Sequence, residues 1–157
     1  MYKEIKQTSF KPQRPILVWD GDCGFCKFWK TRWQLKTGDK IAYKTYQEIA
    51  RFLEDIPLKE FKKASKLIEP NGKVYNGPNS AYRSLWYAGN KFWYNLFESS
   101  QLFKKVSKHT YNHIAKNRSF YFKLTKFALG DNPRKLKHYW IFYLFLVVLF
   151  LFLLLNF

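Results

Sequence analysis

Short apolar runs alternate with longer amphipathic segments in the first half of the chain. Ile16–Trp19 is a four-residue apolar run rich in β-favouring side chains, which predicts a buried strand. Residues 23–36 carry aromatic side chains at helical spacings and predict a helix with an aromatic face toward the sheet. Asp22 is a plausible N-cap for this helix, and Thr37–Asp39 ends it. The alternating residues 41–46 predict a second strand.

The next part of the chain contains the clearest turn signal. Residues 48–55 and 58–64 predict helical pieces that are separated at Pro57. Residues 66–69 and 73–75 predict a hairpin, because the Asn-Gly pair between them supplies the positive backbone angles of a tight turn. Residues 79–87 predict a helix capped by its first or second residue. This order of strands and helices predicts an α/β fold.

The last third of the chain is predicted to be helical. Residues 91–129 predict two or three helical segments. Residues 139–157 contain no charged side chain, and a helix of that length spans about 28 Å, close to a bilayer core of roughly 30 Å. We therefore expect one transmembrane helix here, with a buried core helix as the alternative.

The expected anchor also sets an orientation. Residues 131–138 form a basic juxtamembrane segment directly before the apolar run, and cations flanking a membrane span favour the cytoplasmic side. No apolar leader segment is visible near the N-terminus. We expect a single-pass membrane protein with a C-terminal anchor and a cytoplasmic N-terminal domain.

The length and the net charge of the chain add to this predicted domain organisation. A chain of 157 residues has room for one core, which gives a flexible arm at 1–13 and one domain with a helical extension at 14–130. The net charge is +17, and residues 101–138 hold ten basic side chains against one acidic. Such a segment favours anionic lipid headgroups as a partner. Solvated helix faces are the plain alternative, and single-stranded nucleic acid is the least favoured one.

The two cysteines, Cys23 and Cys26, give the most informative local pattern. At the start of a helix, backbone N–H groups and the positive helix end stabilise the thiolate of Cys23. Cys26 lies one turn later, where it can resolve a mixed disulfide formed by Cys23. Asp20 and Asp22 act in the opposite direction, because nearby negative charge raises a thiol pKa.

Two other interpretations of the cysteine pair stay open. A zinc site needs further ligands, and the histidines of the chain are His109, His113 and His138. His109 and His113 share a helix face, but 82 residues separate Cys26 from His109, which is far beyond zinc-finger spacing. Cys23 and Cys26 can also be buried structural residues.

Three motifs in the chain resemble those of the DCC thiol-disulfide oxidoreductase family. Residues 20–26 (DGDCGFC) fit D-x-x-C-x-x-C after an apolar strand. Residues 76–81 (NGPNSA) look like the family's Gly-x-x-x-Ala helix entry, and residues 111–118 (YNHIAKNR) are similar to its Y-x-x-I-A-x-N-R segment. The resemblance covers roughly residues 14–122, and the apolar tail lies outside it.

The resemblance implies a thioredoxin-like fold and a redox role for Cys23 and Cys26. It also singles out Asp20, which would accept or relay the proton of Cys26; capping of the loop is its alternative role. Arg118 is expected to pair with a carboxylate or with helix carbonyls. One departure concerns residues 62–65, which read Lys-Lys-Ala-Ser where ordinary thioredoxins carry a cis-proline.

These observations predict a membrane-anchored thiol-disulfide oxidoreductase. Cys23, Cys26 and Asp20 form its expected catalytic set, with no cofactor and no metal. Its expected partner is a redox protein or a small thiol. The alternative is a non-catalytic, membrane-bound adaptor or binding module on the same fold.

Overall fold

A four-stranded mixed sheet forms the centre of the protein. The computed structural model describes residues 2–156, without the side chains of residues 150 and 153–156. The first residue of the predicted arm and the last residue of the predicted apolar helix lie outside this part. The elements, in chain order, are β1 (Ile16–Trp19), α1 (Gly24–Thr37), η1 (Gly38–Lys40), β2 (Ala42–Thr45), α2 (Tyr46–Ile49), η2 (Ala50–Phe52), α3 (Lys59–Lys63), β3 (Lys66–Ile68), β4 (Val74–Asn76), α4 (Pro78–Tyr87), α5 (Phe92–Ser99), α6 (Gln101–Lys116), α7 (Arg118–Leu129) and α8 (Tyr139–Asn156).

The strands lie in the order β2-β1-β3-β4. β1 pairs in parallel with β2 and antiparallel with β3, and β3 pairs antiparallel with β4. The predicted hairpin is confirmed, and Gly72 in its turn has a φ of 81°, a conformation that glycine adopts without strain. The predicted α/β class is confirmed as well.

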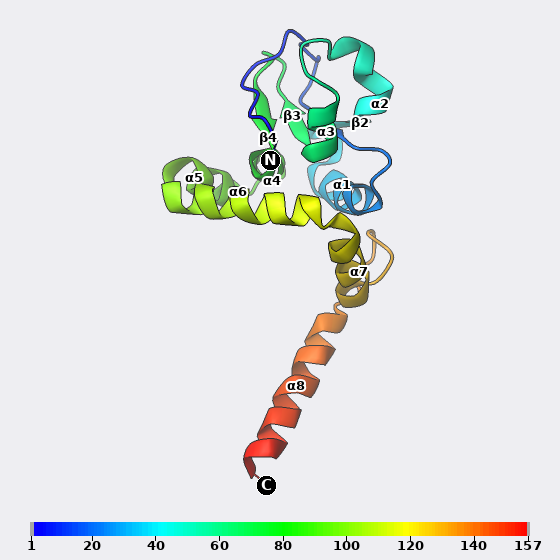
Figure 1. The fold of residues 1–157 in the computed structure, drawn as a ribbon, viewed down its shortest axis with the longest axis vertical. Coiled ribbons are helices and arrows are strands. Elements are labelled where there is room, and N and C mark those ends of the chain that lie inside the picture. Colours follow the sequence, from blue (N-terminus) through cyan, green and yellow to red (C-terminus); the bar gives the residue numbers. More distant parts are fainter. Residues whose placement is uncertain (1, 157) are drawn as a thin grey trace.

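The alternation of side chains along β1 divides the core into two layers. Ile16 and Val18 pack in a cluster with residues of α2, α3 and the segment between them, whereas Leu17 packs on the opposite face with Trp33 of α1 and Tyr87 of α4. Helices therefore cover both faces of the sheet. α1 and α4 lie side by side on one face (Figure 1).

Two helix caps differ from the predictions. Cys23, not Asp22, is the N-cap of α1, and its Sγ accepts a hydrogen bond from the Cys26 N–H at 3.2 Å. α4 begins at Pro78 after Gly77, whose φ is 54°. Proline fits the first helical position because its φ is already helical and its missing N–H would be unpaired there.

The N-terminal segment, predicted as a flexible arm, packs against the domain. Tyr2 is buried, the Lys3 N–H donates to Glu60 Oε2 at 2.6 Å, and the Thr8 hydroxyl donates to Asp55 at 2.7 Å. Hydrogen bonds hold this segment in place. The polar composition of residues 1–13 therefore gave no indication that the segment packs against the domain.

The C-terminal half is helical, as predicted, with α5, α6 and α7 before the apolar tail. α6 runs across the bottom of the domain, and α8 extends away from it in Figure 1. Phe127 of α7 stacks on Tyr143 of α8, with ring centroids 4.5 Å apart.

The predicted membrane anchor is wrong. Within the described residues, no helix combines the length and the apolar character that a membrane span requires. The prediction of a single-pass protein therefore fails, and the cytoplasmic orientation inferred from the anchor no longer follows.

Candidate redox site

The cysteine pair lies where β1 ends and α1 begins. Cys23 and Cys26 form a disulfide with their Cα atoms 5.2 Å apart. The Cys23 N–H donates to the Asp20 carbonyl at 3.2 Å, which closes the loop between strand and helix. The pair therefore lies at the N-terminus of α1, a position at which backbone N–H groups and the helix dipole generally favour a thiolate.

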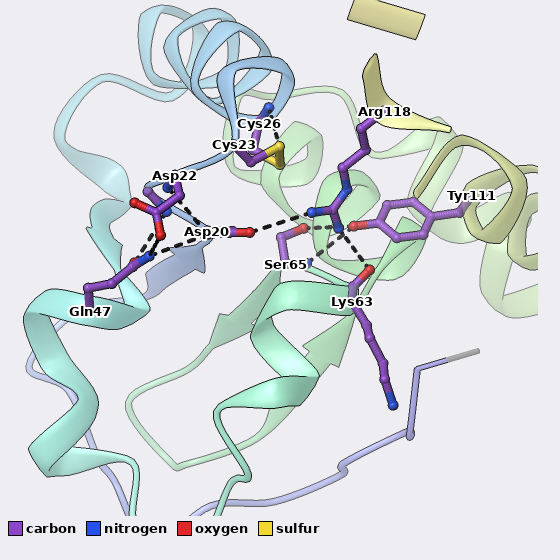
Figure 2. A network of polar contacts seen from close by, with 10 residues as sticks. Asp20, Asp22, Cys23, Cys26, Gln47, Lys63, Ser65, Tyr111 and Arg118 are labelled. Carbon is purple, nitrogen blue, oxygen red and sulfur yellow. Dashed lines mark hydrogen bonds and ion pairs between the residues drawn. A yellow bond between two sulfur atoms is a disulfide. The ribbon is translucent and has the colours of Figure 1, made fainter. Parts of the chain in front are cut away.

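Gln47, next to the start of α2, holds this loop from the side. Its amide nitrogen donates to Asp20 Oδ1 at 3.3 Å and to Asp22 Oδ2 at 3.1 Å, and its oxygen accepts from the Gly21 N–H at 3.2 Å (Figure 2). A Cβ on Gly21 would lie 2.8 Å from Thr45 Cγ2. Glycine is therefore required here by the close approach of the β2 end.

Arg118 approaches the same loop from the start of α7. One terminal nitrogen lies 3.7 Å from Asp20 Oδ2, and the other donates to the Lys63 carbonyl at 3.0 Å. Figure 2 shows the guanidinium between these two partners, beside the disulfide. The expectation that Arg118 pairs with a carboxylate and a helix carbonyl is confirmed.

Asp20 uses its two carboxylate oxygens differently. Oδ1 accepts the Asp22 N–H at 3.3 Å, which caps the loop, while Oδ2 faces Arg118. The side chain is 14% exposed. Loop capping is thus part of its role, and the second oxygen lies toward the cavity described below.

A chain of hydroxyl groups joins α6 to the start of β3. The Tyr111 hydroxyl accepts from the Ser65 N–H at 3.2 Å and lies 3.3 Å from Ser65 Oγ. Ser65 Oγ lies 3.0 Å from Ser80 Oγ, whose hydroxyl donates to the Gly77 carbonyl at 2.7 Å. These bonds connect the second and third sequence motifs directly.

A cavity of about 300 Å³ lies next to the disulfide. Cys26 and Asp20 from the first motif line it, together with Ala81 from the second. The third motif contributes further lining residues: Tyr111, Ile114, Ala115 and Arg118. Three motifs that are far apart in the sequence therefore meet at one place.

The packing of α7 explains a second glycine of the first motif. A Cβ on Gly24 would lie 3.0 Å from the Phe122 ring. Phe122 also makes an edge contact with Phe28, with ring centroids 6.4 Å apart. The C-terminal extension therefore covers the start of α1 closely.

Sequence reasoning missed several residues of the site. No sequence pattern predicted a role for Gln47, because its contacts with the cysteine loop exist only when β2 pairs with β1. Lys30 was missed as well; its side chain lines the cavity, and burial lowers its pKa. Lys66 was also missed; it is buried beneath the arm, and burial lowers its pKa to about 8.

The histidine pair lies elsewhere. His109 and His113 line a groove along α6 together with lysines and Asn112. Among the described residues, no group of three or more His, Cys, Asp or Glu side chains is placed to hold a metal ion. The zinc interpretation therefore finds no ligand set in this part of the chain.

Comparison of the chain with models of known protein families, with curated proteins and with solved structures found no match.

Proposed function

We propose that this protein is a thiol-disulfide oxidoreductase on a thioredoxin-like fold. The observation that carries the proposal is the convergence of the three motifs on one cavity beside the Cys23–Cys26 disulfide. The strand-helix-strand-helix-strand-strand-helix order and the mixed sheet support the fold assignment.

In the proposed reaction, the Cys23 thiolate attacks a substrate disulfide and forms a mixed disulfide. Cys26 then attacks the Cys23 sulfur and releases the second substrate thiol. Asp20 lines the same cavity as Cys26 and would accept the Cys26 proton. The partner is a redox protein or a small thiol, and the site residues require no cofactor for this exchange.

On the proposed fold, residues 62–65 would stand where thioredoxins carry their cis-proline. Lys63 offers its carbonyl to Arg118, and the Ser65 N–H is taken by Tyr111. The described residues contain no cis peptide bond. Because side chains of α6 and α7 occupy these backbone groups, we propose that this protein docks its substrate differently from thioredoxin.

The decisive experiment is a thiol count with and without reductant, followed by measurement of the pair's reduction potential against glutathione or dithiothreitol. We expect two reactive thiols after reduction and a defined two-electron potential. A pair that stays oxidised under strong reductant, or that does not re-form, supports the non-catalytic binding module instead.

We propose that α6 carries a second binding site, for anionic lipid headgroups. Three lysines and two histidines line the α6 groove together with one asparagine: Lys105, Lys108, His109, Asn112, His113 and Lys116. Cations placed along one helix favour anionic headgroups. This contact is independent of the redox site.

A further inference from the structure

The cavity beside the disulfide is walled mainly by large apolar side chains. β1 contributes Leu17 and Trp19, and α3 contributes Phe61. α1 contributes Phe25, Trp29 and Trp33, and two tyrosines come from α6 and α7: Tyr111 and Tyr121. Exposed apolar concavities of this kind are characteristic of binding sites for small apolar molecules.

The polar groups of the cavity are occupied by one another. Arg118 is paired with Asp20, and Tyr111 with Ser65. The ammonium of Lys30 donates to Gln34 at 3.2 Å, outside the cavity lining. A strongly polar substrate would therefore have to break existing pairs, which costs more than the new contacts return.

One donor at the cavity has no partner. The indole N–H of Trp29 is buried and makes no hydrogen bond within the described residues. Buried donors without partners are rare in folded proteins. Since this nitrogen is buried, Trp29 lines the cavity with the carbon atoms of its ring.

We propose that this cavity binds the organic group of a small, apolar disulfide, or of the thiol it yields. The inference rests on the proposed function and names its substrate class. An apolar cavity of roughly 150 Å³ already holds benzene, so about 300 Å³ accommodates one aromatic ring with its linking carbon and sulfur. Cys26 in the cavity wall places the seated sulfur next to the redox pair.

The exchange balances as a two-electron transfer. The Cys23 thiolate forms a bond to one substrate sulfur, and the substrate S–S bond breaks to release the first thiolate, which takes a proton from solvent. The Cys26 thiolate then bonds to Cys23 and releases the second thiolate, which is protonated in turn. The protein dithiol is oxidised, and one substrate disulfide is reduced to two thiols.

The test compares two dialkyl disulfides on the full-length, reduced protein. Dibenzyl disulfide and bis(2-hydroxyethyl) disulfide release thiols of similar acidity, so the comparison isolates the apolar group. Burial of one ring predicts a second-order rate preference of roughly 10- to 100-fold for the benzyl compound. A stopped-flow or quenched assay of remaining protein thiols measures both rates.

Ala115→Phe fills the cavity from α6 and should remove most of this preference, measured as the ratio of the two rates. The matched control is Ala128→Phe, the same change on α7 at a half-buried position that does not line the cavity. Dibenzyl sulfide, which cannot exchange, should quench the fluorescence of the native protein but not that of Ala115→Phe.

The outcomes separate this inference from the proposed function. Equal rates with the two disulfides, or a preference that survives Ala115→Phe unchanged, overturn the apolar substrate class and leave the oxidoreductase assignment standing. A reduced protein that neither disulfide oxidises overturns the oxidoreductase assignment and, with it, the substrate class.

Discussion

Arg118 Nη1 lies 3.7 Å from Asp20 Oδ2, and both side chains are largely buried, at 20% and 14% exposure. The contact joins the start of α7 to the loop that carries the cysteines. It is a positioning contact, because the guanidinium also donates to the Lys63 carbonyl. Arg118 thus ties three separate parts of the chain together.

Removing Arg118 should therefore loosen the site without abolishing the fold. We expect Arg118→Gln to lower the free energy of unfolding by about 2 kcal/mol, because a charged hydrogen bond and a half-buried ion pair are lost. Chemical denaturation measures this loss. Arg118→Lys should recover part of it, and Asp20→Asn combined with Arg118→Gln should cost less than the two single changes added together. Strict additivity would show that the two side chains are not coupled.

The two cysteines should differ in reactivity. We expect Cys26→Ser to keep a rapidly alkylated Cys23 thiol and to accumulate mixed disulfides, because the helix start stabilises that thiolate. Cys23→Ser should leave a slowly alkylated Cys26 that traps nothing, since Cys26 lies one turn further along α1, away from the helix N-terminus. Iodoacetamide alkylation against pH gives both rates and both apparent pKa values.

Asp20→Asn is the companion variant for this experiment. It should retain the first attack by Cys23 but slow the resolution by Cys26, if the carboxylate takes the Cys26 proton. Identical alkylation profiles for the two single-cysteine proteins would contradict the assigned roles.

The start of α4 offers a test of backbone geometry. Gly77 has a φ of 54°, and a Cβ there would lie 2.8 Å from the Tyr2 ring. Gly89 also has a positive φ, 97°, but nothing lies within 4 Å of its Cβ position. Gly89→Ala should cost about 1 kcal/mol of stability from backbone strain alone. Gly77→Ala should cost clearly more, because the buried Tyr2 must move; equal losses in thermal or chemical unfolding would contradict the packing of the arm.

Much of the architecture follows from local pattern, whereas the site does not. β1, the hairpin and α1 were predictable because a short apolar run, the Asn-Gly turn and helical spacing are local signals. Gln47 and Ser65 make their contacts with residues that are distant in the sequence and become neighbours only in the folded protein. No local sequence motif therefore predicts their roles. The packed arm escaped prediction because it is fixed by hydrogen bonds to distant Asp55 and Glu60 and by burial of the single ring of Tyr2, which no local sequence pattern shows.

The groove along α6 should bind anionic lipid in a salt-sensitive manner. We expect the protein to associate with phosphatidylserine vesicles at low salt more strongly than with phosphatidylcholine vesicles, and to lose this difference at high salt. Lys105→Glu with Lys116→Glu should reduce the difference at least several-fold. Lys73→Glu, outside the groove, is the control. Equal binding to both vesicles would reject the lipid contact, and tight binding to single-stranded oligonucleotides would favour nucleic acid.

Lys66 should give the folded protein an unusual pH dependence. Its side chain is fully buried in β3, and its ammonium donates to Asn76 Oδ1 at 2.9 Å between the rings of Tyr2 and Phe61. Burial lowers the pKa of Lys66 from 10.5 to about 8, with Glu60 opposing the shift and Lys63 adding to it. The unfolded chain therefore holds this proton at a pH where the folded protein has released it.

The sign of the effect follows from that difference. From pH 8 to nearly pH 10 the unfolded state binds more protons than the folded state, because Lys66 is protonated only in the unfolded chain, so stability rises with pH. Above about pH 10 the trend reverses, because burial raises the pKa of Tyr43, Tyr87 and Tyr94 to about 12, and unfolding then releases their protons.

Denaturant titrations of the oxidised protein should accordingly show the free energy of unfolding rising by about 1 kcal/mol from pH 8 to about pH 9.5, where the contribution of Lys66 exceeds that of the tyrosines. Lys66→Met should remove the rise, because it keeps the apolar stem and has no proton to lose. Lys73→Met, at an exposed position on the other side of the hairpin turn, should leave the rise intact. A stability that stays flat or falls over this interval in the native protein would show that Lys66 is not buried with a lowered pKa.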